Sequence, residues 1–374
     1  HTSRGCVARC TFCQRSVKGY RTYSANDLET HILELKEKYN VGYVEIQDEN
    51  ALSNKKQAYE VARIMKKCGV LWGATGGVRC TSVNYEDLKF YKEHNLLYIK
   101  FGIESGSQKI LDIMEKKFTT EDVYNAISNC KQIGISTIPA GTLFGMPGET
   151  EETIKESAEF IASLWHLLEY DWNTFYYPTW VIAIPGTPLY EYCQQIGVIG
   201  KTLDEEEDYL IRVSEHGVTP ILGYLNKTDS NIKEVHYWKY LYLYAQKKAY
   251  VGLIIKNNQS IKNRLLQIYE KCIKGALNGL IDNINLRKKS YKNLESAYKM
   301  LTKEFAKIEK NIGDSFTNIY ILKHKFPQNA ASGALEVASP FSLWITSNSL
   351  KIALWLHWGS FWPLLTTSSS LKIP

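Results

Sequence analysis

Short apolar runs alternate with stretches of helical periodicity between residues 24 and 184. The apolar runs have the length of strands, and we expect strands at 41–47, 70–74, 96–103, 135–144 and 173–184. The stretches between them repeat apolar residues on one face, and we expect helices at 24–39, 55–68, 85–94, 119–134 and 149–168. This alternation predicts βαβ units around a parallel sheet, so the chain belongs to the α/β class.

Three cysteines lie close together near the start of the chain, at Cys6, Cys10 and Cys13. Thiolates this close on one loop can converge on one metal centre, and a four-iron cube held by three of them keeps one iron open for a ligand. A zinc loop or a set of redox thiols is the alternative, but structural zinc takes four protein ligands. The other cysteines are isolated in the sequence, at Cys68, Cys80, Cys130, Cys193 and Cys272. An iron–sulfur cluster therefore fits the triplet better than zinc does.

Polar or glycine-flanked residues follow three of the expected strands, where barrel folds place their sites. Asp48 and Glu49 follow the strand at 41–47, in a turn that could equally serve only to begin the next helix. Arg79 follows the next strand, where a lone arginine is either a surface residue or a ligand contact. Glu104 lies between glycines at a strand end, so its carboxylate can accept hydrogen bonds from a ligand's hydroxyl or ammonium groups.

The order of these motifs resembles that of the radical S-adenosylmethionine (SAM) enzymes. The matching runs are R-G-C-x3-C-x-F-C, G-I-E-S-G-S, M-P-G-E-T and P-G-T-P-L-Y-E, which together span residues 4 to about 197. The resemblance implies a [4Fe–4S] cluster whose open iron chelates SAM, and reductive cleavage of SAM to a 5′-deoxyadenosyl radical. It also implies a partial (β/α)6 barrel of the TIM type with its first strand truncated, followed by an α-helical C-terminal region.

The same resemblance assigns roles to individual residues. Cys6, Cys10 and Cys13 are expected to hold the cluster and to be the catalytic ligands. The amino group of SAM is expected at Asp48 or Glu49, and Arg79 is expected near its carboxylate or the substrate. Further cofactor contacts are expected at Phe12, Gly102, Glu104, Ser105, Gly106 and Pro185.

The combination of motifs looks most like the cobalamin-binding branch of these enzymes, which includes methylases and the anaerobic magnesium-protoporphyrin ester cyclase. A cobalamin domain precedes the cysteine loop in that branch, so cobalamin would bind through an N-terminal domain missing from this chain. A tRNA methylthiotransferase is the alternative enzyme, and a non-catalytic metal-binding protein is the alternative from another class. The expected partners are a small-molecule substrate and a reductant such as flavodoxin or ferredoxin.

Changes in composition divide the chain into three parts. Residues 1–200 are expected to form the radical SAM core. Residues 201–326 form a basic helical region with 22 Lys and Arg against 14 Asp and Glu, and solvated helix faces explain these charges without nucleic acid. Residues 327–374 hold four of the nine tryptophans and one acidic residue, as expected of an out-of-frame or disordered tail.

Two further expectations concern location. The apolar stretch at 341–365 is interrupted by Ser, Asn, Lys and His, whereas a membrane span needs about 20 mostly apolar residues. We therefore expect no membrane partner. Eight cysteines without a disulfide-type spacing, and no recognisable signal peptide, predict a cytoplasmic protein.

Overall fold

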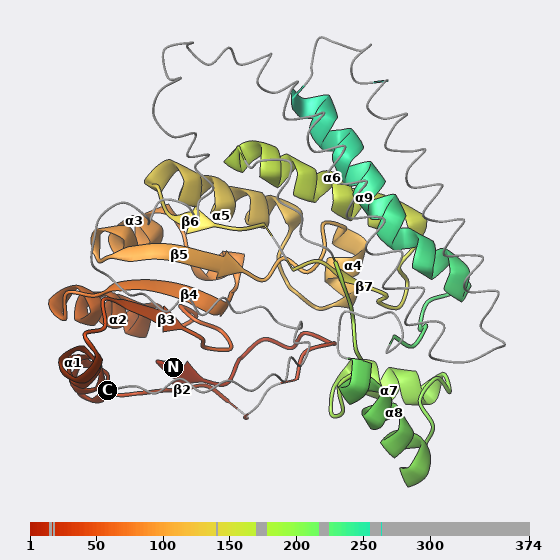
Figure 1. The fold of residues 1–374 in the computed structure, drawn as a ribbon, viewed down its shortest axis with the longest axis horizontal. Helices are drawn as coiled ribbons and strands as arrows, with labels where there is room; N and C mark the ends of the chain where they lie inside the picture. The colour runs from red at the N-terminus through yellow and green to blue at the C-terminus, as the bar shows by residue number, and fades with distance from the viewer. Residues whose placement is uncertain are drawn as a thin grey trace, which may run out of the picture.

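Four parallel strands form the central sheet of the computed structural model, in the order β3-β4-β5-β6 (Figure 1). The structure describes residues 1–14, 17, 19–139, 141–169, 178–216, 224–254 and 263. The strands of this sheet are β3 (Tyr43–Ile46), β4 (Leu71–Val78), β5 (Leu96–Phe101) and β6 (Ser136–Thr137). The predicted α/β class with a parallel sheet is confirmed.

A second parallel pair forms a separate two-stranded sheet. It consists of β7 (Leu143–Phe144) and β8 (Thr179–Trp180), and a parallel bridge from Glu104 to Thr142 joins it to the chain that follows β5. The single strand expected at 135–144 is therefore divided into β6 and β7. Within the described residues the strands form an open arc, as expected of a partial barrel.

The first two strands lie outside this sheet. β1 (Ser3–Arg4) pairs in antiparallel fashion with β2 (Arg21–Thr22), so the segment between them, residues 5–20, is closed at its base. We call this segment the cysteine loop, because it contains the triplet. The β1–β2 pair thus brings the beginning and the end of the loop together.

Helices alternate with the strands, and successive helices pack against one another along the sheet (Figure 1). They are α1 (Ala25–Tyr39), α2 (Lys55–Lys67), α3 (Tyr85–Glu93), α4 (Gln108–Ile113), α5 (Thr120–Ile133), α6 (Glu151–Leu168), α7 (Pro188–Gln195), α8 (Leu203–His216) and α9 (Ile232–Ile254), with a short 3-10 turn at Cys80–Ser82. Local signals fix several ends: capping boxes begin α3, α5 and α6, and Gly134 in the left-handed region ends α5.

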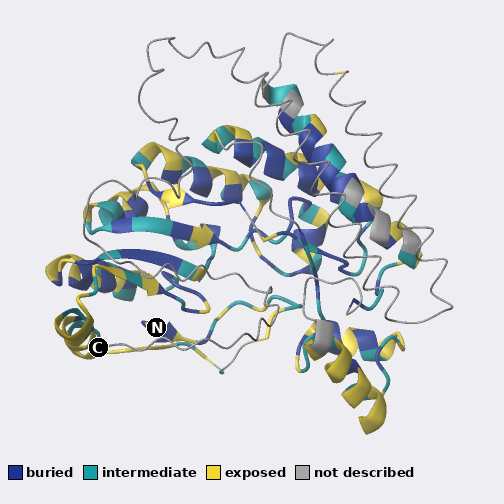
Figure 2. Ribbon diagram, viewed as in Figure 1, coloured by how far each residue is buried: buried dark blue, intermediate teal, exposed yellow. Residues whose placement is uncertain are grey.

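The main core lies between the sheet and the helices that pack along it (Figure 2). Trp72 and Trp165 are among its largest fully buried side chains, and burial of each such side chain contributes about 2–3 kcal/mol. Helix α9 packs along α6 and adds Trp238 and Tyr242 to this core. The Tyr242 hydroxyl lies 3.3 Å from the hydroxyl of Thr142. Helix α9, which belongs to the region 201–326, is thus packed against the core formed by residues 1–200.

A second, smaller cluster joins α4, α7 and the chain after β8. Its buried residues include Ile110, Met146, Leu189 and Tyr209. No described helix is long and apolar enough to cross a membrane. The expected tail at 327–374, and most of the region 255–326, lie outside the described residues.

Candidate functional site

The base of the cysteine loop is a close contact between two stretches of backbone. Gly5 has a φ of 86°, in the left-handed region, and a Cβ at this position would lie 2.0 Å from the carbonyl oxygen of Gly19. Only glycine fits such an approach without displacement of the chain. The Arg-Gly-Cys run therefore contributes to the shape of the loop as well as to its chemistry.

The middle of the loop is anchored through Thr11. Its backbone N–H donates to the Met114 carbonyl at 3.1 Å, its hydroxyl donates to the Ile113 carbonyl at 3.0 Å, and its own carbonyl accepts from the N–H of Leu189 at 3.0 Å. The next residue, Phe12, packs against the second hydrophobic cluster. The loop is thereby held between the C-terminal end of α4 and the start of α7. This placement gives Phe12 an anchoring role and leaves contact with SAM a prediction.

The three thiols of the loop interact with one another electrostatically. Desolvation raises the pKa of Cys13 to about 11, with smaller contributions from the neighbouring Cys10 and Cys6, because adjacent thiolates repel one another. Desolvation also raises the pKa of Cys10. A bound metal centre would reverse these shifts, since a coordinating thiol is deprotonated. All three are free cysteines in the structure.

The donor set of the loop fits an iron–sulfur cluster. No three His, Cys, Asp or Glu side chains among the described residues are grouped closely enough to hold a single metal ion. A four-iron cube is larger than one ion and takes its thiolates from more widely separated positions. Three free thiols on one anchored loop, two of which contribute to the raised pKa of Cys13, meet that requirement.

Glu104 lies beside this loop at the end of β5. Its backbone is in the left-handed region, with a φ of 55°, and its carboxylate forms an ion pair with the ammonium group of Lys116 at 2.5 Å. The side chain of Lys116 is only 7% exposed and that of Glu104 is 19% exposed. Both charges act electrostatically on the thiol of Cys10. The Lys116 ammonium lowers the pKa of this thiol, and the Glu104 carboxylate raises it. A Cβ at position 102 would lie 2.8 Å from the Glu104 carboxylate, so Gly102 provides the space that this side chain occupies.

Arg79 provides a second cation at the same place. Its guanidinium donates to the carbonyl of Lys116 and lies over the ring of Phe118, with 5.5 Å to the centroid. Its charge also lowers the pKa of Cys10. Sequence reasoning identified Arg79 but missed Lys116, because a lysine between a helix and a loop has no local feature that separates it from a solvated one. The structure brings both cations and Glu104 to the cysteine loop.

The next residues of the Gly-Ile-Glu-Ser-Gly-Ser run pack against α6. The hydroxyl of Ser105 lies 3.0 Å from the hydroxyl of Ser157, and the N–H of Gly106 donates to the same oxygen at 3.1 Å. A Cβ at Gly106 would lie 2.6 Å from the Cβ of Phe160. Ser105 and Gly106 therefore support the turn that carries Glu104.

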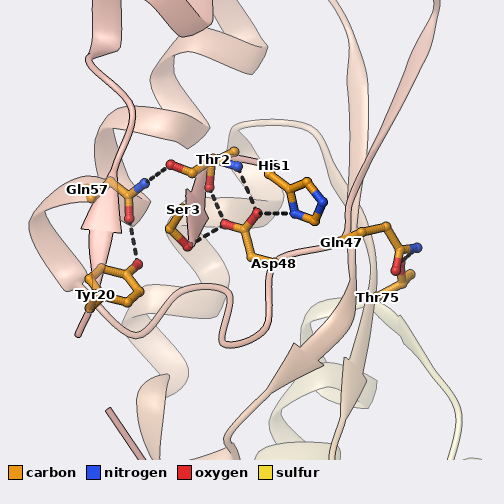
Figure 3. A network of polar contacts seen from close by, with 8 residues as sticks. All are labelled: His1, Thr2, Ser3, Tyr20, Gln47, Asp48, Gln57 and Thr75. Carbon is orange, nitrogen blue, oxygen red and sulfur yellow. Dashed lines mark hydrogen bonds and ion pairs between the residues drawn. The ribbon is translucent and has the colours of Figure 1, made fainter. Parts of the chain in front are cut away.

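The two carboxylates expected to bind the amino group of SAM differ in their surroundings. Asp48 is fully buried and accepts hydrogen bonds from Thr2 and Ser3 (Figure 3), whereas Glu49 is exposed. The following residue, Asn50, is 2% exposed, and neither polar atom of its side chain has a hydrogen-bond partner among the described residues. No local feature of the sequence distinguishes these three positions.

Two motifs remain, the turn at Pro185 and the Met-Pro-Gly-Glu-Thr run. The side-chain amide of Gln14 donates to the carbonyl of Pro185 at 3.5 Å, which places the turn before α7 beside the loop. In the Met-Pro-Gly-Glu-Thr run, Glu149 lies just before α6, and its carboxylate accepts from the N–H groups of Gly145 and Met146. Burial raises the pKa of Glu149 to about 8 and lowers the pKa of the nearby Lys227 to about 7.

Comparison with known proteins gives the same family as the motifs. Residues 1–161 match the family model of the radical SAM superfamily. An uncharacterized methyltransferase of Pyrococcus horikoshii is 26% identical over 283 residues, which are 75% of this chain and 56% of the relative. The anaerobic magnesium-protoporphyrin IX monomethyl ester cyclase of Cereibacter sphaeroides is 28% identical over 200 residues, which are 50% of this chain and 31% of the relative. The chain thus spans about half or less of the length of these relatives.

A solved structure shows the same fold. The cobalamin-dependent S-adenosylmethionine radical enzyme OxsB with aqua-cobalamin bound superposes with a TM-score of 0.50 at 13% identity, over 83% of this chain and 54% of that chain. The expected resemblance to radical SAM enzymes is confirmed by the family match and by relatives that include a methyltransferase and a cyclase. Residues 1–161 thus form a radical SAM domain, and the enzymes of that superfamily use a [4Fe–4S] cluster and SAM.

Proposed function

We propose that this chain is the radical SAM core of a methyltransferase or cyclase, with its cluster held by Cys6, Cys10 and Cys13. One observation carries the proposal: three free thiols lie on an anchored loop, beside Glu104 and Arg79, which follow parallel strands, and Lys116, which follows α4. When bound, the cluster supplies the electron that cleaves the sulfonium C–S bond of SAM. The protein's own part is to hold SAM and the substrate in one orientation and to limit access of water.

The charges near the loop match the polar groups of SAM. Lys116 and Arg79 are cations that can pair with the SAM carboxylate, and Glu104 can accept hydrogen bonds from its ammonium or ribose hydroxyl groups. Glu104 and Lys116 are paired with each other in the absence of ligand, so neither charge is left unpaired before SAM binds. Binding would exchange this ion pair for contacts with the zwitterionic end of SAM.

Fewer groups at the end of β3 can contact the SAM amino group than the sequence suggested. The Asp48 carboxylate is engaged by Thr2 and Ser3, so we place the SAM amino group at the exposed Glu49 or at the backbone carbonyls of this turn. Pro185 borders the loop through Gln14 and is proposed to line the adenine side of the site.

The methyltransferase or cyclase assignment follows the relatives named above. In this proposal cobalamin is a second cofactor, as in OxsB, and it is contributed by a part of the protein outside these 374 residues. The substrate is a small molecule, and a flavodoxin or ferredoxin supplies electrons. Neither a nucleic acid nor a membrane is required as a partner.

Anaerobic reconstitution tests the assignment of the cluster. We expect about four irons and four sulfides per chain, and reductive formation of 5′-deoxyadenosine from SAM. Cys10→Ala should abolish both. Cys193→Ala alters a thiol buried in the second hydrophobic cluster, and it should leave both intact. Equal dependence on Cys193 and Cys10 would contradict the three-thiolate site.

Product analysis tests the reaction. Cobalamin-dependent methylation or cyclisation of a small molecule, by protein that includes the cobalamin-binding part, would support the proposal. Formation of methylthio-tRNA would instead support the methylthiotransferase alternative, and cluster binding without SAM cleavage would support a non-catalytic protein.

A further inference from the structure

The buried carboxylate of Asp48 accepts three short hydrogen bonds from residues 46 and 45 positions earlier in the chain. The N–H of Thr2 donates to Oδ1 at 2.7 Å, and the hydroxyls of Thr2 and Ser3 both donate to Oδ2 at 2.6 Å (Figure 3). Asp48 is 0% exposed, and Ser3 is 1% exposed. Hydrogen bonds to an ionised acceptor in a buried place are the stronger kind. The segment before the cysteine loop is therefore fixed to the end of β3.

The same residue, Thr2, also holds the segment that leaves the loop. Its carbonyl accepts from the N–H of Tyr23 at 3.1 Å and from the side-chain amide of Gln57 on α2 at 2.8 Å. Gln57 in turn accepts from the hydroxyl of Tyr20 at 2.8 Å, and Tyr20 is the last residue of the loop (Figure 3). Both ends of the cysteine loop thus meet in one hydrogen-bond network, which we call the Asp48 network: Thr2, Ser3, Tyr20, Asp48 and Gln57.

This network acts at the base of the loop. The base is the β1–β2 pair and the close approach of Gly5 to Gly19, and β1 begins at Ser3, which the network holds directly. The tip of the loop is held separately, through Thr11. Fixing the base reduces the conformational freedom of the loop before any cluster binds, which lowers the entropy cost of binding.

We propose that Asp48 is a positioning residue for the cluster: its carboxylate holds the two ends of the cysteine loop together and so keeps the three thiolates arranged for [4Fe–4S] binding. Asp48 contacts neither SAM nor iron in this role. The inference rests on the proposed cluster site, and it differs from the expectation that Asp48 binds the amino group of SAM. It predicts that weakening the network makes the cluster easier to lose without lowering the intrinsic affinity for SAM.

Two isosteric variants test the proposal, Asp48→Asn and Thr2→Val. Hydrogen–deuterium exchange of the cluster-free protein should be faster in peptides that cover residues 4–21 for both variants. In reconstituted protein, release of iron to a chelator should be about 10-fold faster, the change expected for loss of one hydrogen bond to a charged group. The double variant should release iron little faster than Asp48→Asn alone, because Asp48→Asn already removes the contact that Thr2→Val breaks. The SAM dissociation constant of fully loaded protein should be unchanged.

Thr75→Val is the matched control. Thr75 accepts a hydrogen bond from Gln47 near the end of the same sheet, but it does not contact the Asp48 network (Figure 3). This variant should match the parent in both exchange and iron release. Unchanged exchange and release in both Asp48→Asn and Thr2→Val would overturn the inference, and so would a loss of SAM affinity with a stable cluster. If Asp48→Asn fails to fold, Thr2→Val still decides the question. Failure of the parent protein to bind any cluster would instead refute the proposed function.

Discussion

The ends of β3 and β5 each carry a carboxylate, yet the two are used differently. Asp48, after β3, is fully buried, and both of its oxygens accept hydrogen bonds from Thr2 and Ser3. Glu104, after β5, is 19% exposed at its side chain and pairs with one lysine in a left-handed turn. The difference teaches that position at the end of a strand does not by itself make a carboxylate a ligand-binding group.

The surroundings explain the contrast in energetic terms. A carboxylate with several protein donors gains little from a ligand, because the ligand must displace hydrogen bonds already made. A carboxylate with a single ion-pair partner near the solvent can exchange that partner at low cost. The predictions below test this division, with β3 expected to control the loop and β5 to control SAM.

The largest effect is expected from Gly5→Ala, which acts at the base of the loop. The new methyl group would lie 2.0 Å from the Gly19 carbonyl, and the left-handed φ of 86° adds strain. Iron content after reconstitution should fall by more than half, while the far-UV circular dichroism of the chain is retained. Gly42→Ala, where a Cβ would meet no atom within 4 Å, is the control and should load normally. A normal iron content of Gly5→Ala after reconstitution would show that the cluster does not require the close approach of Gly5 to Gly19.

Lys116→Met should have the next largest effect, because it leaves Glu104 without its cation. Loss of one partner from a buried pair costs about 3 kcal/mol in stability, here lessened by the partial exposure of Glu104. SAM affinity should fall as well, since a proposed carboxylate partner is lost. Urea unfolding and equilibrium binding of SAM measure the two effects. Lys109→Met, which changes an exposed lysine on α4, should alter neither.

Glu104→Gln should weaken SAM binding by about 1–3 kcal/mol, the range for loss of a charged hydrogen-bond partner. Iron content and iron release should be unchanged, in contrast with the Asp48→Asn variant. Binding titrations on fully loaded protein provide the measurement. Equal SAM affinity in variant and parent would return Glu104 to a structural role and remove the contrast between the two strand ends.

The smallest effect concerns Glu149, a buried carboxylate with no part in the loop. Its folded pKa of about 8 exceeds the ordinary value of 4.5, so the folded state retains a proton that the unfolded state has lost. Stability should therefore fall as the pH rises from about 4.5 to about 8. Glu149→Gln should reduce this fall and so flatten the dependence of Tm on pH over this range. Thermal unfolding of cluster-free protein would show it, and identical pH profiles would contradict it.

Lys227 gives the opposite slope. Burial lowers its pKa from 10.5 to about 7, so the unfolded state binds the extra proton at higher pH, and stability should rise between about pH 7 and 10.5. The combined contribution of these two groups to stability should accordingly be smallest near pH 7–8.

The regular part of the fold was predictable because its signals are local. The helices expected at 55–68 and 85–94 occur as Lys55–Lys67 and Tyr85–Glu93, each after an Asn whose side chain accepts from the backbone. The strand expected at 135–144 is divided into β6 and β7, because strand pairing depends on neighbours distant in sequence. The strand expected at 173–184 is seen only as Thr179–Trp180, since 170–177 lie outside the described residues.

The candidate site was predictable in its motifs and not in its contacts. The triplet, Arg79 and Glu104 could be named because each lies in a recognisable run or follows a strand. The partner of Glu104 could not, because Lys116 lies beyond a helix that the sequence did not indicate. The role of Asp48 depends on Thr2, 46 residues away, and no local pattern connects them. Whether each of these residues binds a cofactor stays a prediction.

The packing of α9 has a consequence for the order in which the chain can fold during synthesis. Tyr242 contacts Phe144 with 5.0 Å between ring centroids, and its hydroxyl reaches Thr142, 100 residues earlier. The aromatic surface around β7 and β8 therefore stays uncovered on the ribosome until α9 has emerged. During that interval we expect the nascent chain to expose an apolar surface next to strands β3–β5. Chaperones that bind emerging polypeptides recognise apolar surface of this kind.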